Sequence, residues 1–257
     1  MVLQAGEIAA TWRNSPLAAV PPPELVLVTD FDGTLADIVA DPDQAAARPE
    51  ALEALDRLVR LLADVIVLSS RTIVQLEQLV PISGVRLIGD GGRPIPRHAQ
   101  KEALERFNAD ASALLVSIRG ASLEVKPASS AIHFRNADIS AEQMLALIQP
   151  LLDGRRLASD LGRKVIEVHA PNAGKGSALS ALLPGEDPGG VVFFGDDEND
   201  RSMFEYVSAL EIPHMCVGVS SPEAPRDLFE RCDVVVAGPA EAAALLNEIS
   251  GWASSYE

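Results

Sequence analysis

The stretch Leu-Val-Leu-Val-Thr-Asp-Phe-Asp-Gly-Thr, residues 25–34, decides the fold. Its first five residues form a nearly continuous apolar run, which is typical of a strand buried on both faces of a parallel sheet. Asp30 and Asp32 follow this run directly, and Gly33 favours a tight turn. An apolar strand that ends in two carboxylates and a glycine predicts an open α/β sheet with a site at the carboxyl end of the strand.

Apolar runs of the same kind recur along the chain and alternate with helical patterns. We predict further strands at residues 65–68, 85–88, 191–194, 215–219 and 234–237. Apolar residues at helical spacing predict helices at 49–62 and 174–183. The first twenty-odd residues end in three prolines and are interpreted as a helical or irregular lead-in. This alternation predicts a doubly wound, parallel, Rossmann-like sheet.

The middle of the chain breaks this rhythm. Residues 113–118, 123–126, 130–135 and 164–169 are typical of half-exposed strands, and residues 141–152 of a helix. The alternation of Ala131, His133 and Arg135 with Ile132 and Phe134 gives one polar and one apolar face. We therefore predict an inserted α+β domain at 95–170, an antiparallel sheet with helices on one side, within a catalytic core formed by 1–94 and 171–257.

The composition bounds the class of protein. The chain has 257 residues, 47% of them hydrophobic and 23% charged, as in an ordinary globular protein. A net charge of −16 argues against a nucleic-acid partner, which needs a basic face. No apolar stretch approaches the length of a membrane span. Cys216 and Cys232 flank apolar runs and are interpreted as buried free thiols, so we expect a cytoplasmic protein. A monomer is favoured, and the oligomeric state is left open.

Polar side chains gather where three of the predicted strands end. Because the carboxyl ends of parallel strands meet at one edge of a sheet, we expect these side chains to lie close together. Two like charges ~4 Å apart repel by ~4 kcal/mol at an effective dielectric constant of 20, so the acids call for a cation. Oxygen ligands alone favour Mg²⁺, and a lysine at a predicted helix start adds positive charge. The residues concerned are Asp30, Asp32, Ser69, Arg71, Lys175, Asp196, Asp197 and Asp200.

Three rival motifs fail on spacing. A phosphate-binding P-loop needs a glycine where His169 stands, five residues before Gly174. A dinucleotide fingerprint from Gly89 needs glycine or alanine where Pro94 stands. An EF-hand loop from Asp30 needs its glycine at the sixth position, whereas Gly33 is at the fourth.

The segments Asp-Phe-Asp-Gly-Thr-Leu at 30–35, Ser69, Lys175 and Gly-Asp-Asp-Glu-Asn-Asp at 195–200 resemble, in order, the four motifs of the haloacid dehalogenase superfamily. The resemblance implies that Asp30 attacks phosphorus and that Asp32 serves as general acid and then base. It also implies that Ser69 and Lys175 hold phosphoryl oxygens. Magnesium would be held by Asp30, the Asp32 main-chain carbonyl and Asp196, with Asp197 and Asp200 supporting them.

The predicted insertion carries a second resemblance. The stretch Glu-Val-Lys-Pro-Ala-Ser-Ser-Ala-Ile-His-Phe-Arg at 124–135 is similar to the cap signature of trehalose-6-phosphate phosphatases, and Val-Ile-Glu-Val at 165–168 to their second cap carboxylate. A sugar-phosphate substrate is implied. The implied substrate-binding residues are Glu124, Lys126, Ser129, His133, Arg135 and Glu167, together with Thr34 and Arg71, which we expect to shape the site.

The chain departs from the family pattern at four positions outside the core motifs. Gly91 and Pro94 replace a usual His and Glu, His169 replaces an Arg, and Gly174 replaces an acid or amide. The identity of the sugar therefore stays open. Trehalose-6-phosphate is the first candidate; the phosphate of a trehalose-like pseudo-disaccharide, of sucrose, of mannosylglycerate or of glucosylglycerol is an alternative. A phosphomutase and a non-catalytic sugar-phosphate-binding module are further hypotheses.

Overall fold

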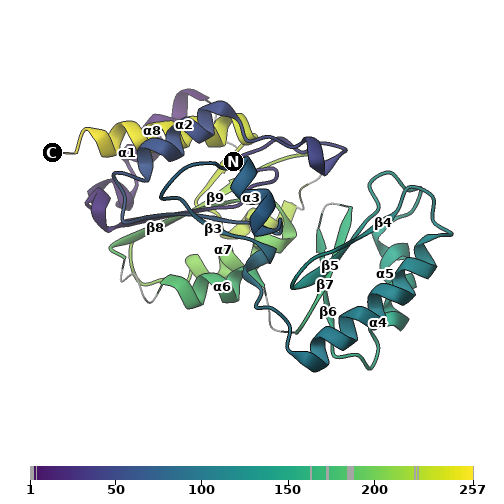
Figure 1. The fold of residues 1–257 in the computed structure, drawn as a ribbon. Helices are drawn as coiled ribbons and strands as arrows, with labels where there is room; N and C mark the ends of the chain where they lie inside the picture. The colour runs from purple at the N-terminus through teal and green to yellow at the C-terminus, as the bar shows by residue number, and fades with distance from the viewer. Residues whose placement is uncertain are drawn as a thin grey trace.

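The computed structural model describes residues 3, 5–162, 164–171, 174–183, 188–222, 224 and 226–256. Within these residues a six-stranded sheet and a four-stranded sheet form two bodies that lie side by side (Figure 1). The larger sheet is wholly parallel and the smaller one wholly antiparallel. The predicted fold class, a doubly wound parallel sheet with an α+β insertion, is confirmed.

The strand order of the parallel sheet places its first strand at the centre. The order is β10-β9-β8-β1-β2-β3, so the chain winds outward in both directions from the pair β1 and β8. Such a reversal of strand order is where open α/β sheets bind ligands. The strands are β1 (Leu25–Thr29), β2 (Asp64–Leu68), β3 (Arg86–Ile88), β8 (Gly190–Gly195), β9 (His214–Val219) and β10 (Val234–Val236).

Helices cover both faces of the parallel sheet, which explains its continuous apolar strands. Leu25 and Leu27 of β1 face one core cluster, and Val26 and Val28 face the other. Figure 1 shows α1, α2 and α8 on one side and α6 and α7 on the other. The helices are α1 (Ile8–Arg13), α2 (Pro49–Leu58), α3 (Ile73–Leu79), α6 (Lys175–Leu182), α7 (Arg201–Val207) and α8 (Pro239–Ser254).

The antiparallel sheet has one apolar and one polar face, as its sequence alternation predicts. Ile132, Phe134, Ile166 and Val168 pack with the helices into a separate core cluster. The opposite face looks toward the parallel sheet. The order of its strands is β4-β5-β7-β6. The elements are β4 (Ser122–Val125), β5 (Ser129–His133), β6 (Ala158–Gly162), β7 (Val165–His169), α4 (His98–Leu115) and α5 (Ala141–Leu152).

One predicted strand of the insertion is wrong. Residues 113–118 form the last turn of α4 and the turn after it. Leu104, Phe107, Ala111 and Leu115 are buried at spacings of three and four residues, so helical periodicity decides the local structure. Conversely, β6 has no predicted counterpart, because its sequence Ala-Ser-Asp-Leu-Gly lacks strand-forming residues.

The connection from the parallel sheet to the antiparallel one turns sharply after β3. Asp90, Gly91 and Gly92 all have positive φ angles, of 54°, 62° and 68°. A Cβ at Gly92 would overlap the Cβ of Ala178 in α6, so glycine is required here both for its backbone angle and for space. The next residue, Arg93, already contacts the antiparallel sheet.

Two findings bear on the environment of the chain. Cys216 and Cys232 are not joined in a disulfide; Cys216 is buried as predicted, and Cys232 is partly exposed. Among the described helices, none combines the length and the apolar character needed to cross a bilayer.

Candidate active site

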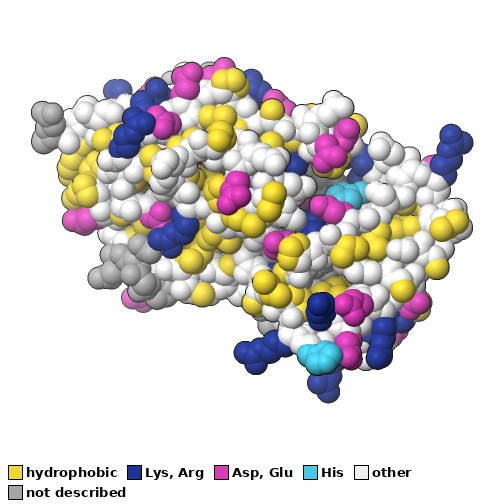
Figure 2. All heavy atoms as spheres, in the orientation of Figure 1, with side chains coloured by type: hydrophobic (Ala, Val, Ile, Leu, Met, Phe, Trp, Pro, Cys, Tyr) yellow, Lys and Arg dark blue, Asp and Glu magenta, His cyan; other side chains and the backbone are white. Residues whose placement is uncertain are grey.

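The order of the strands brings the predicted catalytic segments together. β1 lies between β8 and β2, so Asp30, Asp196 and Ser69 follow the ends of three adjacent strands. Their side chains line one wall of a pocket of about 710 Å³, and the polar face of the antiparallel sheet lines the other wall. Figure 2 shows a hollow between the two bodies, with acidic, basic and histidine side chains around it.

Asp30 is buried against a lysine. The Lys175 ammonium donates to Asp30 Oδ1 at 2.5 Å and to Asp200 Oδ1 at 2.7 Å, and all three side chains are at most 5% exposed. Burial, with help from the Asp200 charge, raises the pKa of Asp30 to about 7 even though Lys175 opposes the shift. The charges of Asp200 and Asp30 raise the pKa of Lys175 against the effect of burial. Lys175 is therefore a fixed positive charge beside the predicted nucleophile.

The carboxylates next to Asp30 form a group suited to a cation. Ligand oxygens of Asp30, Asp196 and Asp200 lie within 4.8 Å of one another, and all three residues are buried. Asp200 Oδ2 accepts bonds from the backbone N–H groups of Asp196 and Asp197, and its Oδ1 is bound by Lys175. Asp200 therefore orients the turn that carries Asp196. A Cβ at Gly33, where φ is +79°, would overlap the Asp196 carboxylate, so the loop after β1 lies directly against it.

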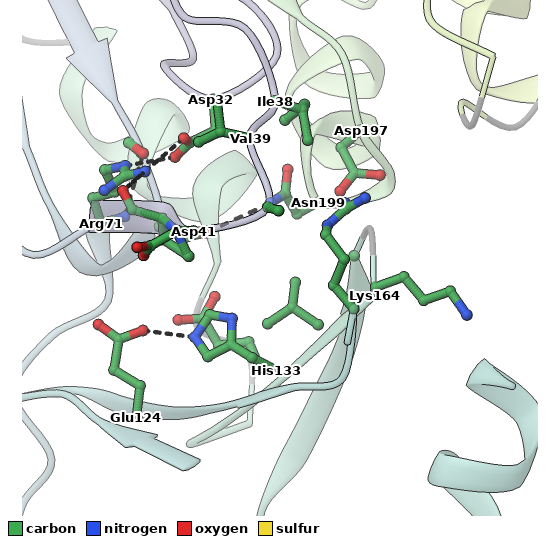
Figure 3. A pocket seen from close by; sticks show the side chains of 18 of the residues that line it. Asp32, Ile38, Val39, Asp41, Arg71, Glu124, His133, Lys164, Asp197 and Asn199 are labelled. Carbon is green, nitrogen blue, oxygen red and sulfur yellow. Dashed lines mark hydrogen bonds and ion pairs between the residues drawn. The ribbon is translucent and has the colours of Figure 1, made fainter. Parts of the chain in front are cut away.

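Asp32 and Arg71 form a tight pair at the pocket wall (Figure 3). The Arg71 guanidinium donates to both Asp32 oxygens, each at 2.8 Å, and also to the Pro42 carbonyl. Arg71 stacks over the ring of Phe31 at 5.5 Å. Thr34, by contrast, does not line the pocket: it is 1% exposed, and no described residue hydrogen-bonds its hydroxyl.

The loop after β2 supplies hydroxyl and backbone groups. Ser69 is buried at the pocket wall and accepts a bond from the backbone N–H of Arg71. The Ser70 carbonyl accepts a bond from Lys126 Nζ at 2.8 Å, which ties the antiparallel sheet to the core. Asp197, also at the pocket, caps the turn that follows it by accepting from the Glu198 N–H at 2.7 Å.

The predicted substrate-binding residues of the insertion also converge. His133 Nε2 contacts Glu124 at 2.9 Å, as Figure 3 shows, and this bond lowers the pKa of Glu124 in spite of its partial burial. Lys126 and Ser129 donate to Glu167 Oε1 at 3.2 and 2.8 Å. Arg135 lines the same pocket, while Ser129 lies buried behind Glu167 and outside its lining.

The sequence patterns did not identify three residues of the site. Arg93 bridges Asp160 at 2.9 Å and Glu167 at 3.1 Å, and His169 Nε2 contacts Asp160 at 2.9 Å. Arg93 follows two glycines in a connecting loop, and Asp160 stands on a strand that was not predicted, so neither carried a local signal. The departure of His169 from the family pattern was the one available hint.

Comparison with known proteins places these features in a family. Residues 28–227 match the family model for trehalose-phosphatase. A trehalose-phosphate phosphatase of Mycobacterium bovis (strain BCG) is 32% identical over 202 residues, which cover 72% of this chain and 51% of that protein. The chain thus spans about half the length of the curated relatives it matches.

Solved structures share the fold. The C-terminal domain of trehalose-6-phosphate phosphatase from Candida albicans superposes with a TM-score of 0.76 at 19% identity, covering 97% of each chain. A trehalose-6-phosphate phosphatase related protein superposes with a TM-score of 0.71 at 18% identity, covering 90% of this chain and 100% of its own.

Proposed function

The chain belongs to the trehalose-phosphatase family of the haloacid dehalogenase superfamily, and from this premise we propose that it hydrolyses a sugar phosphate, with trehalose-6-phosphate as the first candidate. The observation that carries the proposal is the position of Asp30. Its buried carboxylate contacts Lys175 and belongs to an acidic group that lies within 4.8 Å. It opens onto a pocket whose other wall carries side chains able to bind hydroxyl groups.

The proposed chemistry has two displacements. An Asp30 oxygen bonds to phosphorus while the bond between phosphorus and the sugar oxygen breaks, and Asp32 gives a proton to that oxygen. A water molecule, giving its proton to Asp32, then attacks phosphorus, and the bond to Asp30 breaks to release phosphate. Splitting the reaction in this way makes each step easier, and Lys175 and Ser69 would hold the phosphoryl oxygens throughout.

Asp32 needs one rearrangement for this role. Arg71 binds both oxygens of its carboxylate. A carboxyl group that carries a proton cannot accept at both positions in the same way, so at least one bond to Arg71 has to be released at that stage. Arg71 thus fits a role in holding Asp32 at the pocket wall between proton transfers.

A divalent cation fits the acidic group. Ligand oxygens of three buried carboxylates lie within 4.8 Å of one another, close enough to share one ion, and oxygen ligands favour Mg²⁺. Asp30, Asp196 and the Asp32 carbonyl would hold the ion, with Asp197 and Asp200 orienting the turn. When bound, it would supply positive charge to the transferring phosphoryl group.

A panel of sugar phosphates tests the proposal. Phosphate release is measured with and without Mg²⁺ for trehalose-6-phosphate, sucrose-6-phosphate, glucose-6-phosphate and the phosphates of mannosylglycerate and glucosylglycerol. We expect Mg²⁺-dependent release with a preference for the disaccharides and none from Asp30→Asn. Equal rates on all substrates contradict the sugar assignment. An isomerised sugar phosphate without free phosphate identifies a phosphomutase, and binding without turnover identifies a binding module.

Three finer points belong to the proposal as well. The division of the chain at 94/95 and 170/171 into core and cap is supported by the separate core clusters of the two bodies. A cytoplasmic location is supported by two free thiols.

We also propose that the protein is a monomer, and analytical ultracentrifugation tests this oligomeric state.

A further inference from the structure

The register of the antiparallel sheet puts three carboxylates in one row across the pocket wall. Glu124 on β4 pairs with Ala131 on β5, Ala131 pairs with Glu167 on β7, and Glu167 pairs with Asp160 on β6. Directly paired residues of an antiparallel sheet point to the same face, so the row spans all four strands. The methyl side chain of Ala131 leaves space between Glu124 and Glu167.

Basic side chains stand between these carboxylates and form an alternating ladder. His133 contacts Glu124 at 2.9 Å, and Lys126 lies 3.9 Å from Glu124 and 3.2 Å from Glu167. Arg93 joins Glu167 to Asp160, and His169 contacts Asp160 from the end of the row. Closely spaced carboxylates that each contact Lys126 or Arg93 and accept further hydrogen bonds can stay ionised in a partly buried wall.

The carboxylates of the ladder differ in what they offer to the pocket. Glu167 is 7% exposed in its side chain, and both of its oxygens are used, by Ser129 and Lys126 on one and Arg93 on the other. The Asp160 side chain is 44% exposed and lines the pocket. Arg93 and His169 both bind Oδ2. Among the described residues, none donates a side-chain hydrogen bond to Oδ1.

Asp160 is also held in one orientation and one charge state. Its two partners are almost completely buried, Arg93 at 2% and His169 at 4% side-chain exposure, so they are fixed by packing. Burial alone would raise the pKa of Asp160, but the hydrogen bond and charge of His169 and the charge of Arg93 lower it. His169 Nδ1 lies 2.7 Å from the Ala170 carbonyl, which fixes the other side of the ring.

We propose that Asp160 is a substrate-binding residue that accepts a hydrogen bond from a hydroxyl group of the sugar, with Arg93 and His169 as its positioning residues. This inference rests on the proposed function and names what the cap wall selects: a neutral, hydroxyl-rich alcohol portion of the phosphate ester. An anionic group at the same place would meet the Asp160 carboxylate. His169 is one of the departures from the family pattern named above, and Arg93 precedes another, Pro94.

The test compares Asp160→Ala and Asp160→Asn with the unchanged protein on trehalose-6-phosphate and p-nitrophenyl phosphate. Loss of a charged acceptor for a hydroxyl is expected to raise KM for the disaccharide phosphate about tenfold in Asp160→Ala and less in Asp160→Asn. The kinetics on p-nitrophenyl phosphate, which has no sugar hydroxyl, should stay unchanged. Asp138→Ala, an exposed carboxylate of the same body outside the pocket, is the matched control.

Deoxygenated substrates separate a direct contact from a structural effect. In a series of monodeoxy trehalose-6-phosphates, one member should lose about tenfold in kcat/KM with the unchanged protein and nothing further with Asp160→Ala. A purely structural role would lower kcat/KM for every member by the same factor. That result would overturn the inference.

Calorimetric titration with unphosphorylated trehalose measures the contact with Asp160 without turnover. We expect the Kd to rise about tenfold in Asp160→Ala. Equal binding with and without Asp160, or no binding at all, contradicts the inference. Binding that depends on Asp160 in a protein that releases no phosphate would overturn the proposed function alone.

Discussion

The two walls of the pocket handle charge in opposite ways. On the core wall the carboxylate oxygens of Asp30, Asp196 and Asp200 lie within 4.8 Å of one another, and the Lys175 ammonium contacts those of Asp30 and Asp200. On the cap wall, carboxylates and basic side chains alternate from His133 to His169. The core wall thus gathers its carboxylates around one point, whereas the cap wall pairs each carboxylate with basic side chains. The arrangement of acids, more than their number, separates a site for an ion from a site for neutral hydroxyl groups.

Replacement of Asp30 should abolish phosphate release and leave the stability of the protein intact. In Asp30→Asn we expect phosphate release to fall by about 10³-fold or more, because an amide oxygen does not act as the nucleophile. The unfolding free energy should hold or rise, because a buried charge is removed from an acidic group. Rate assays and urea unfolding measure the two effects. A marked loss of stability would mean that the core acids are paired as in the cap.

Replacement of Arg93, on the cap wall, should have the opposite effect: it should lower the stability of the protein and leave the phosphoryl-transfer chemistry intact. Arg93→Met leaves Glu167 and Asp160 without their shared cation, and breaking a buried ion pair costs about 3 kcal/mol. Urea unfolding should show this loss, and KM for the disaccharide phosphate should rise while turnover of p-nitrophenyl phosphate is retained.

The matched control is Arg106→Met, since Arg106 is 75% exposed and 4.0 Å from Glu102. An exposed pair of this kind contributes less than about 1 kcal/mol. Equal losses in the two variants would show that the ladder does not stabilise the cap.

Magnesium should stabilise the protein through the core wall alone. At a concentration of about 100 times its Kd, a bound ion raises the unfolding free energy by about 2.7 kcal/mol. Thermal unfolding in EDTA and in MgCl₂ measures this shift, which Asp196→Asn should abolish and Asp160→Asn should leave unchanged. Persistence of the full shift in Asp196→Asn would place the ion elsewhere.

The two walls should respond to pH with opposite signs in metal-free protein. The folded-state pKa of Asp30, at about 7, lies above its ordinary value of 3.8, so its contribution to stability is lost as the pH rises from about 4 to 7. The pKa of Glu167 is lowered from 4.5 to about 2, mainly by Lys126 and Arg93 against the effect of burial. Its contribution is present above about 4.5 and is lost as the pH falls toward 2.

For one titrating proton, the unfolding free energy changes by at most about 1.4 kcal/mol per pH unit. Urea unfolding of the unchanged protein, Asp30→Asn and Glu167→Gln across this range separates the two groups. The pKa values of Glu124 and Asp160 are lowered too, so part of the decline below pH 4.5 should remain in Glu167→Gln. A decline as steep in Glu167→Gln as in the unchanged protein would contradict the assignment to Glu167.

The core wall could be predicted from sequence, and so could the residues of the cap wall from Glu124 to Glu167, but the end of the cap wall around Asp160 could not. Asp30, Ser69 and Asp196 each follow an apolar strand, and the parallel order of those strands alone brings them together. Asp160 meets Glu167 only through the register of β6 and β7, and the sequence of β6 gives no strand signal. Arg93 reaches both acids from a loop whose course depends on three left-handed residues. Local patterns predict strand ends well, whereas contacts across a sheet need its pairing.

The turn after β3 also bears on the spacing between the two walls of the pocket. Gly92 lies against Ala178 of the core, and its neighbour Arg93 is anchored to β6 and β7. The chain therefore passes from a contact with the core to ion pairs with the cap between two adjacent residues. A change in sequence that lengthens or loosens this crossing would therefore change the spacing between the two walls of the pocket, because little chain lies between the residue packed on the core and the residue paired with the cap.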